Sequence, residues 1–141
     1  MSNQKPNIGL FITVDELYST AFDMFDIDKV VQKDINKLIG SLSQQNQVHF
    51  TKIARTEQDG EQVGKQFASL DLDLIIISQF VYTLDEPILG FLREIRKDIP
   101  LLVLMVQGYE GIPEDLTVTD FSRSWGINGT LQMTASIPNM V

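Results

Sequence analysis

Cysteine is absent from this sequence of 141 residues, and His49 is its only histidine. A disulfide framework, a thiolate metal site, a cysteine nucleophile and a multi-histidine metal site are therefore excluded. Basic residues are scarce too: 11 Lys and Arg stand against 19 Asp and Glu, which gives a net charge of −8. Because nucleic acids and anionic membranes are bound through basic patches, we expect neither as a partner.

Long hydrophobic runs are missing as well. No stretch approaches the roughly 18 apolar residues that a membrane-spanning helix needs, and residues 1–6 are polar, unlike a signal peptide. The nucleotide-binding patterns G-x-G-x-x-G and G-x-x-x-x-G-K-[ST] do not occur. An apolar content of 43% in a chain of this length predicts one globular domain, which we expect in the cytoplasm.

Apolar runs and amphipathic stretches alternate along the chain. Strands are expected near residues 7–13, 48–54, 73–78 and 101–106, and the last two runs are apolar enough for strands buried on both faces. Helical spacing of apolar residues fills the intervals, and a last, weakly patterned helix follows with Asp120 as its cap. This order predicts an α/β fold: a flavodoxin-like, three-layer parallel sheet in the strand order 2-1-3-4, with helices on both faces.

Acidic side chains follow the first expected strand. In an open parallel sheet, ligands bind outside the carboxyl ends of the strands, near the point where the strand order reverses. Asp15, Glu16 and Tyr18 stand there, and the two carboxylates either bind a divalent cation or form a solvated pair. A phosphoacceptor receiver domain would also need an aspartate after the third strand, where Ser78 and Gln79 stand instead.

Aromatic and amide side chains follow the third and fourth strands. Phe80 and Tyr82, next to Gln79, have the chemistry to stack on and hydrogen bond to a sugar, or else to cover the end of the sheet. The run QGY at 107–109 has the same character. His49 lies inside the second strand with no carboxylate or serine close to it in sequence, so we interpret it as structural.

The last 27 residues fit the expected domain poorly. They contain Gly126, Gly129 and the lone Trp125, but no apolar stripe strong enough to fix a helix on the sheet. We therefore interpret residues 1–114 as a flavodoxin-like α/β domain and residues 115–141 as a segment that connects it to a following domain.

Four stretches of the sequence resemble the amino-terminal domain of the L-fucose and L-arabinose isomerase family. They are IGLFITVDELY (8–18), LDLIIISQFVYTL (72–84), IPLLVLMVQ (99–107) and DLTVTDFSRSWGINGTLQM (115–133). In the last stretch, Asp120 and Phe121 stand where the family has an Asp-Phe pair before its second domain. The resemblance implies that the full-length enzyme is a homo-oligomer that interconverts an aldose and a ketose with a divalent metal, usually manganese, held by later domains.

In this family the first domain helps to build the oligomer and lends loops to the sugar pocket of a neighbouring subunit. Together with the loops after the strands, the resemblance predicts a sugar-pocket rim made of Asp15, Glu16, Tyr18, Phe80, Tyr82, Gln107, Trp125 and Asn128. We expect no catalytic residue, no metal ligand and no cofactor in this chain, so that it is inactive alone. Gly126 and Gly129 stand where arabinose-type enzymes carry an amide and a histidine, which leaves the sugar open. The alternative is a free-standing flavodoxin-like module that binds a small polar ligand or acts as a regulator.

Overall fold

The computed structural model describes residues 5–20, 27–107, 111 and 114–137. In chain order the elements are β1 (Asn7–Thr13), α1 (Leu17–Thr20), α2 (Ile27–Leu42), β2 (Gln47–His49), β3 (Ile53–Ala54), α3 (Glu57–Ala68), β4 (Leu74–Gln79), α4 (Glu86–Glu94), β5 (Leu101–Met105), α5 (Val118–Ser124) and α6 (Gly126–Ser136). None of the helices in these parts of the chain is long and apolar enough to cross a membrane.

The sheet has the predicted topology. All strand pairings among the described residues are parallel, and the order is β2-β1-β4-β5, which confirms the flavodoxin-like α/β arrangement. The strand expected at 48–54 is divided in two. β2 pairs with residues 7–9 of β1 and β3 with residues 12–13, and the edge strand has one extra residue between these two contacts. An irregularity of this kind is common at a sheet edge.

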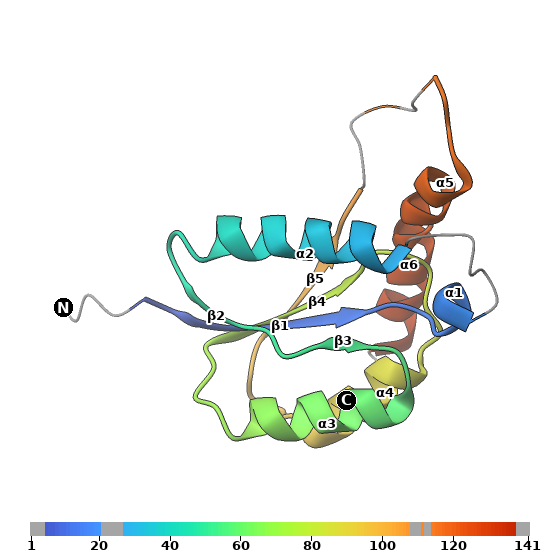
Figure 1. Ribbon diagram of the computed structural model, residues 1–141. Coiled ribbons are helices and arrows are strands. Elements are labelled where there is room, and N and C mark those ends of the chain that lie inside the picture. The colour runs from blue at the N-terminus through green and yellow to red at the C-terminus, as the bar shows by residue number, and fades with distance from the viewer. Residues whose placement is uncertain (1–4, 21–26, 108–110, 112–113, 138–141) are drawn as a thin grey trace.

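Helices cover both faces of the sheet, as expected. α2 packs on one face, whereas α3 and α4 pack together on the other (Figure 1). Because side chains alternate along a strand, Leu10 and Ile12 of β1 face α2 while Phe11 faces the opposite helices. Phe11 stacks on Phe91 of α4 with 3.9 Å between the ring centroids.

β5 is not the fully buried strand that its apolar sequence predicts. It forms the edge of the sheet, and Leu102 and Met105 are 47% and 53% exposed. The pattern of a central strand therefore occurs at a position with a neighbouring strand on one side only, within the described residues.

The tail differs from its prediction as well, because two helices form in it and the second packs on the sheet. Met133 of α6 is 1% exposed in the core that α3 and α4 share, and α5 is tied to α2 by an ion pair of 2.6 Å between Arg123 and Asp34. Thr117, not Asp120, is the N-cap of α5, and Asp120 accepts a hydrogen bond from the Thr117 backbone N–H. That residues 115–141 also lead into a following domain stays a prediction.

Two glycines explain why helical periodicity missed this packing. A Cβ atom at Gly126 would lie 2.5 Å from the carbonyl oxygen of Gln79, and one at Gly129 would lie 2.2 Å from the side-chain oxygen of Gln79. α6 approaches the end of β4 through backbone rather than through an apolar stripe, so its contact face leaves no hydrophobic pattern in the sequence.

Candidate functional site

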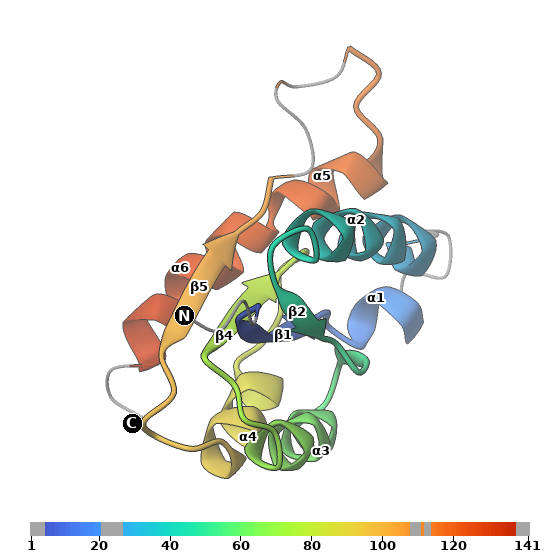
Figure 2. The same cartoon turned by 90° about the vertical axis from the view of Figure 1, so that its left-hand side faces the viewer.

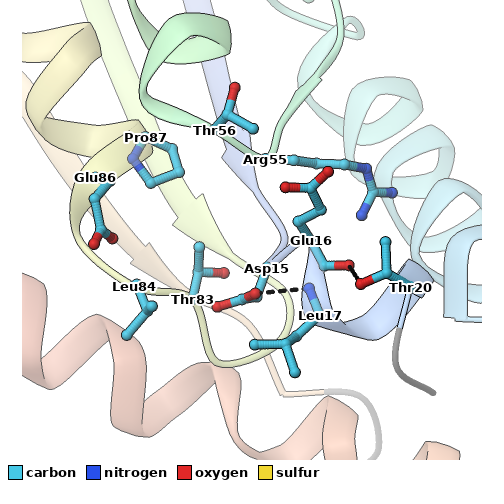
Figure 3. Close-up of a pocket in the computed structure, with 10 residues that line it drawn as sticks. All are labelled: Asp15, Glu16, Leu17, Thr20, Arg55, Thr56, Thr83, Leu84, Glu86 and Pro87. Atoms are coloured by element: carbon cyan, nitrogen blue, oxygen red, sulfur yellow. Dashed lines mark hydrogen bonds between the residues drawn. The ribbon is translucent and has the colours of Figure 1, made fainter.

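A pocket of about 310 Å³ opens at the carboxyl end of β1. It lies between the loops that follow β1, β3 and β4, which is the region expected for a ligand in this topology (Figure 3). Its volume is at the lower end of the roughly 300–1,000 Å³ typical of small-molecule sites. The lining residues are Asp15, Glu16, Leu17, Thr20, Arg55, Thr56, Thr83, Leu84, Glu86 and Pro87.

The two predicted carboxylates both line this pocket. Asp15 Oδ1 accepts a hydrogen bond of 2.8 Å from the Leu17 backbone N–H and so holds the first turn of α1. Glu16 is exposed, and its carboxylate lies alongside the Arg55 side chain (Figure 3). Both acids lie in the turn just before α1 and line the same pocket.

Arg55 is the residue that the sequence interpretation missed. Its Nη2 atom donates to Asp28 Oδ1 at 2.6 Å, while its Nη1 atom is buried and has no hydrogen-bond partner among the described residues. A buried N–H group without a partner is costly unless a ligand or water accepts from it. The available signal was its position directly after the second strand, where the carboxyl-end rule places ligand contacts.

The amino ends of α3 and α4 form another wall of the pocket. Thr56 caps α3 in a reciprocal capping box with Asp59, and α4 begins at Glu86 and Pro87. Burial alone would raise the pKa of Asp59, but hydrogen bonds from Lys52 and from backbone N–H groups outweigh it and hold the pKa below its ordinary value. The partial positive charge of two helix ends offsets part of the negative charge of the pocket.

The pocket chemistry favours a neutral, hydroxyl-rich ligand. The pocket lining contains three carboxylates, those of Asp15, Glu16 and Glu86, and a single guanidinium group, that of Arg55, so it repels anions. Carboxylate oxygens accept hydrogen bonds from hydroxyl groups, and a guanidinium group donates them, so the lining offers both kinds of partner to a hydroxyl-rich ligand.

The predicted tyrosines lie behind this pocket rather than on its surface. Tyr18 is only 8% exposed and packs in the core below α2. Burial, and then the nearby Asp15 and Tyr82, raise the pKa of Tyr18 above its ordinary value. Tyr82 is half-buried, and its hydroxyl donates to the side-chain oxygen of Gln132 on α6 at 3.0 Å. Both side chains support the walls of the site in this structure.

Phe80 and Gln107 line a different pocket. It has a volume of about 250 Å³ and lies between α2 and the ends of β4 and β5, with Asp34, Lys37, Leu38, Ser41 and Val106 as its other lining residues. Phe80 is 4% exposed and belongs to the core on the α2 side. Gly108 and Tyr109, the rest of the QGY run, lie outside the described residues.

Trp125 and Asn128 line neither pocket. Trp125 is 43% exposed at the junction of α5 and α6, and the distance between its ring centroid and that of Phe121 is 4.9 Å. Asn128 is exposed and its backbone N–H donates to the Trp125 carbonyl. The structure thus brings together Asp15 and Glu16 of the eight predicted rim residues, with Tyr18 and Tyr82 behind them.

The resemblance places the metal of the full-length enzyme in later domains, and we expect no metal ligand in this chain. Among the described residues, no three His, Cys, Asp or Glu side chains come close enough to hold an ion.

Comparisons with protein-family models and with curated proteins return no match for this chain.

Proposed function

We propose that this chain is the amino-terminal domain of a cytoplasmic sugar isomerase of the L-fucose and L-arabinose type. In this proposal the domain supplies the rim of a sugar pocket and contributes to the oligomer. The manganese and the groups that perform the isomerisation come from polypeptide other than these 141 residues.

The observation that carries the proposal is the pocket at the end of β1. Asp15 and Glu16 belong to IGLFITVDELY, one of the stretches that resemble the family, and they meet Arg55 around a space of about 310 Å³. In this arrangement Asp15 and Glu16 accept hydrogen bonds from sugar hydroxyls, and the Arg55 guanidinium donates to a ring or carbonyl oxygen. These contacts bind and orient a sugar, and they transfer no proton or hydride.

Sugar binding tests the proposal directly. We would follow backbone amide resonances of the labelled chain during titration with L-fucose, L-arabinose and, as a non-sugar control, glycerol. Because only the rim is present, we expect a dissociation constant on the order of 1 mM or weaker, equivalent to about 4 kcal/mol. The shifts should centre on the loops after β1 and β3.

Variants of the lining locate the site. Asp15→Asn and Arg55→Ala should each weaken sugar binding about tenfold, since a hydrogen bond to a charged group contributes roughly 1.5 kcal/mol or more. Glu61→Gln is the matched control, because Glu61 lies on α3 outside the pocket lining. Binding that is the same in all three variants would contradict the proposed rim, as would no sugar binding at all.

Activity is the second readout. The chain with excess manganese should not interconvert any of these aldoses and ketoses, because the described residues offer no site that holds the ion. Turnover that survives repurification and is abolished by a chelator would show that the chain carries its own catalytic groups.

The free-standing binding module is the second candidate, and one observation favours it. The pocket is lined on three sides by loops of this chain alone. A screen of small polar ligands separates the two functions: micromolar binding of a compound that is not a sugar, at the same Asp15 and Arg55, would favour the module.

A further inference from the structure

β5 presents one side of its backbone to β4 and the other to the free edge. The Pro100 carbonyl accepts a hydrogen bond from the Ile75 N–H at 3.0 Å, and the Leu104 carbonyl accepts one from the Ser78 hydroxyl at 2.8 Å. Even-numbered residues therefore direct their backbone groups toward β4. Since these groups alternate sides along a strand, the odd-numbered residues direct theirs away from the sheet.

The outward groups belong to Leu101, Val103 and Met105, and no strand among the described residues pairs with them. Natural edge strands are usually blunted by charges, proline or a bulge. The segment Leu101–Met105 contains neither charge nor proline, and its register with β4 runs without a break. Leu102 and Met105 are also about half exposed, so the edge combines backbone hydrogen-bonding groups with apolar side chains.

This edge lies beside α6, and neither β5 nor α6 contains a charged residue; the two elements together form the uncharged side. β5 and α6 lie together on the side opposite β2 (Figure 2). Among the described residues, none at 99–107 or 124–137 is charged, although the whole chain carries a net charge of −8. α6 adds Leu131, which is 56% exposed. Depletion of charge together with exposed Leu and Met side chains is typical of an interface centre.

We propose that β5 pairs with β5 of a second copy of this chain, antiparallel, so that the two sheets become one. The charge distribution selects this occupant. A basic partner would be drawn to the acidic surface, whereas two acidic copies repel each other everywhere except at an uncharged side. The inference names the surface for the oligomerisation part of the proposed function and rests on that part alone, independently of the sugar pocket.

The geometry of β5 is self-complementary, as a two-fold interface requires. With the two-fold axis at Val103, the N–H of Val103 donates to the C=O of Val103 of the partner subunit, and the reverse bond forms by symmetry. Leu101 then pairs with Met105 of the partner subunit. On the α2 side of the sheet, Leu102 then lies against Leu104 of the partner subunit. Every cross-strand pair is apolar, and a shift by one residue would turn the bonding groups out of register.

The oligomeric state in solution tests this surface. Light scattering on the full chain at about 100 µM, where a dimer of micromolar affinity is mostly formed, should give twice the monomer mass of 15.9 kDa. Leu102→Lys places a charge at both symmetric positions, and we expect the dissociation constant to rise at least about tenfold, equivalent to 1.4 kcal/mol. Met105→Pro removes an outward N–H and should act in the same direction while leaving the pairing with β4 intact.

The matched control is Leu116→Lys, which makes the same charge change at a residue of similar exposure, 46%, next to Asp115 and outside the uncharged side. It should leave the dimer unchanged. A monomeric wild-type chain, or a dimer that persists in both β5 variants, would overturn the inference. Titrating each β5 variant with sugar distinguishes the dimer proposal from the sugar-pocket proposal. Loss of the dimer should leave sugar affinity unchanged, because β5 does not line the pocket at β1.

Discussion

Replacing Gly60 by alanine should separate the amino ends of α3 and α4, which form one wall of the candidate pocket. A Cβ atom at Gly60 would lie 1.9 Å from the Pro87 carbonyl oxygen, and ordinary contact begins at 3.4 Å, so the helices would have to move apart by about 1.5 Å. The obstacle is backbone, which cannot rotate away. Such a movement also disturbs Phe91 of α4, which stacks on Phe11 in the core.

The magnitude follows from two opposing terms. Overpacking costs about 1–3 kcal/mol, and we take the upper end because the clash is with backbone. Alanine regains about 1 kcal/mol of helix propensity, so the net loss should be about 2 kcal/mol, or roughly 8 °C in Tm for a domain of this size. Gly40→Ala is the matched control. Gly40 is exposed on α2, and a Cβ atom there would have nothing within 4 Å among the described residues, so this variant should gain about 0.5–1 kcal/mol.

Urea and thermal unfolding of both variants, followed by circular dichroism, measure these differences. Sugar affinity should fall in Gly60→Ala and stay unchanged in Gly40→Ala, since only the first lies beneath the pocket wall. Equal stabilisation by the two substitutions would refute the close approach of α3 and α4.

Three further predictions concern single side chains. Asp59→Ala should cost about 1 kcal/mol at pH 7, because it removes the hydrogen bonds that Asp59 accepts in the capping box of α3. Since the pKa of Asp59 is lowered in the folded state, the difference from wild type in urea unfolding should close as the pH falls below 3.8. Burial raises the pKa of Tyr18, so the folded chain should lose stability as the pH rises through 10, where tyrosine in the unfolded chain ionises first. Asp15→Asn should lower the pKa of Tyr18 in a tyrosinate absorbance titration, because the Asp15 charge also raises it. An unchanged titration would contradict the proximity of Asp15 and Tyr18. Trp125→Ala should change the free energy of unfolding by less than about 1 kcal/mol, whereas a loss of roughly 3–5 kcal/mol would place the side chain in a core.

The sheet was predictable because burial on two faces leaves a strong mark on sequence. The runs at 7–13 and 73–78 are nearly continuous apolar stretches, and the topology of alternating strands and helices leaves few arrangements for them. The position of β5 was not predictable by the same rule. An apolar strand that is exposed at a sheet edge has the same composition as one that is covered, so the pattern alone does not distinguish the two.

The candidate site was predictable in part, for a geometrical reason. Asp15 and Glu16 follow a strand in one short turn, and the carboxyl-end rule places them correctly. Gln79 and Phe80 are neighbours in sequence but pack on opposite faces of the sheet, since Phe80 joins the α2 side and Gln79 faces α6. Adjacent residues at a strand end therefore contribute to different pockets, which sequence order does not reveal. Arg55 follows the second expected strand, but its contact with Asp28, 27 positions away, is not visible in the sequence.

The tail links the pocket to the uncharged side of the molecule. Thr83 and Leu84 line the pocket, and the loop that carries them is held by α6 through the bond between Tyr82 and Gln132 and through the approach of Gly129 to Thr83. The same helix borders the β5 edge that we assign to the dimer. No residue of β5 lines the pocket at the end of β1, so a dimer through β5 leaves that pocket open. If a neighbouring subunit completes the sugar pocket, it must therefore do so through a second interface, and an assembly larger than a dimer follows from combining the two.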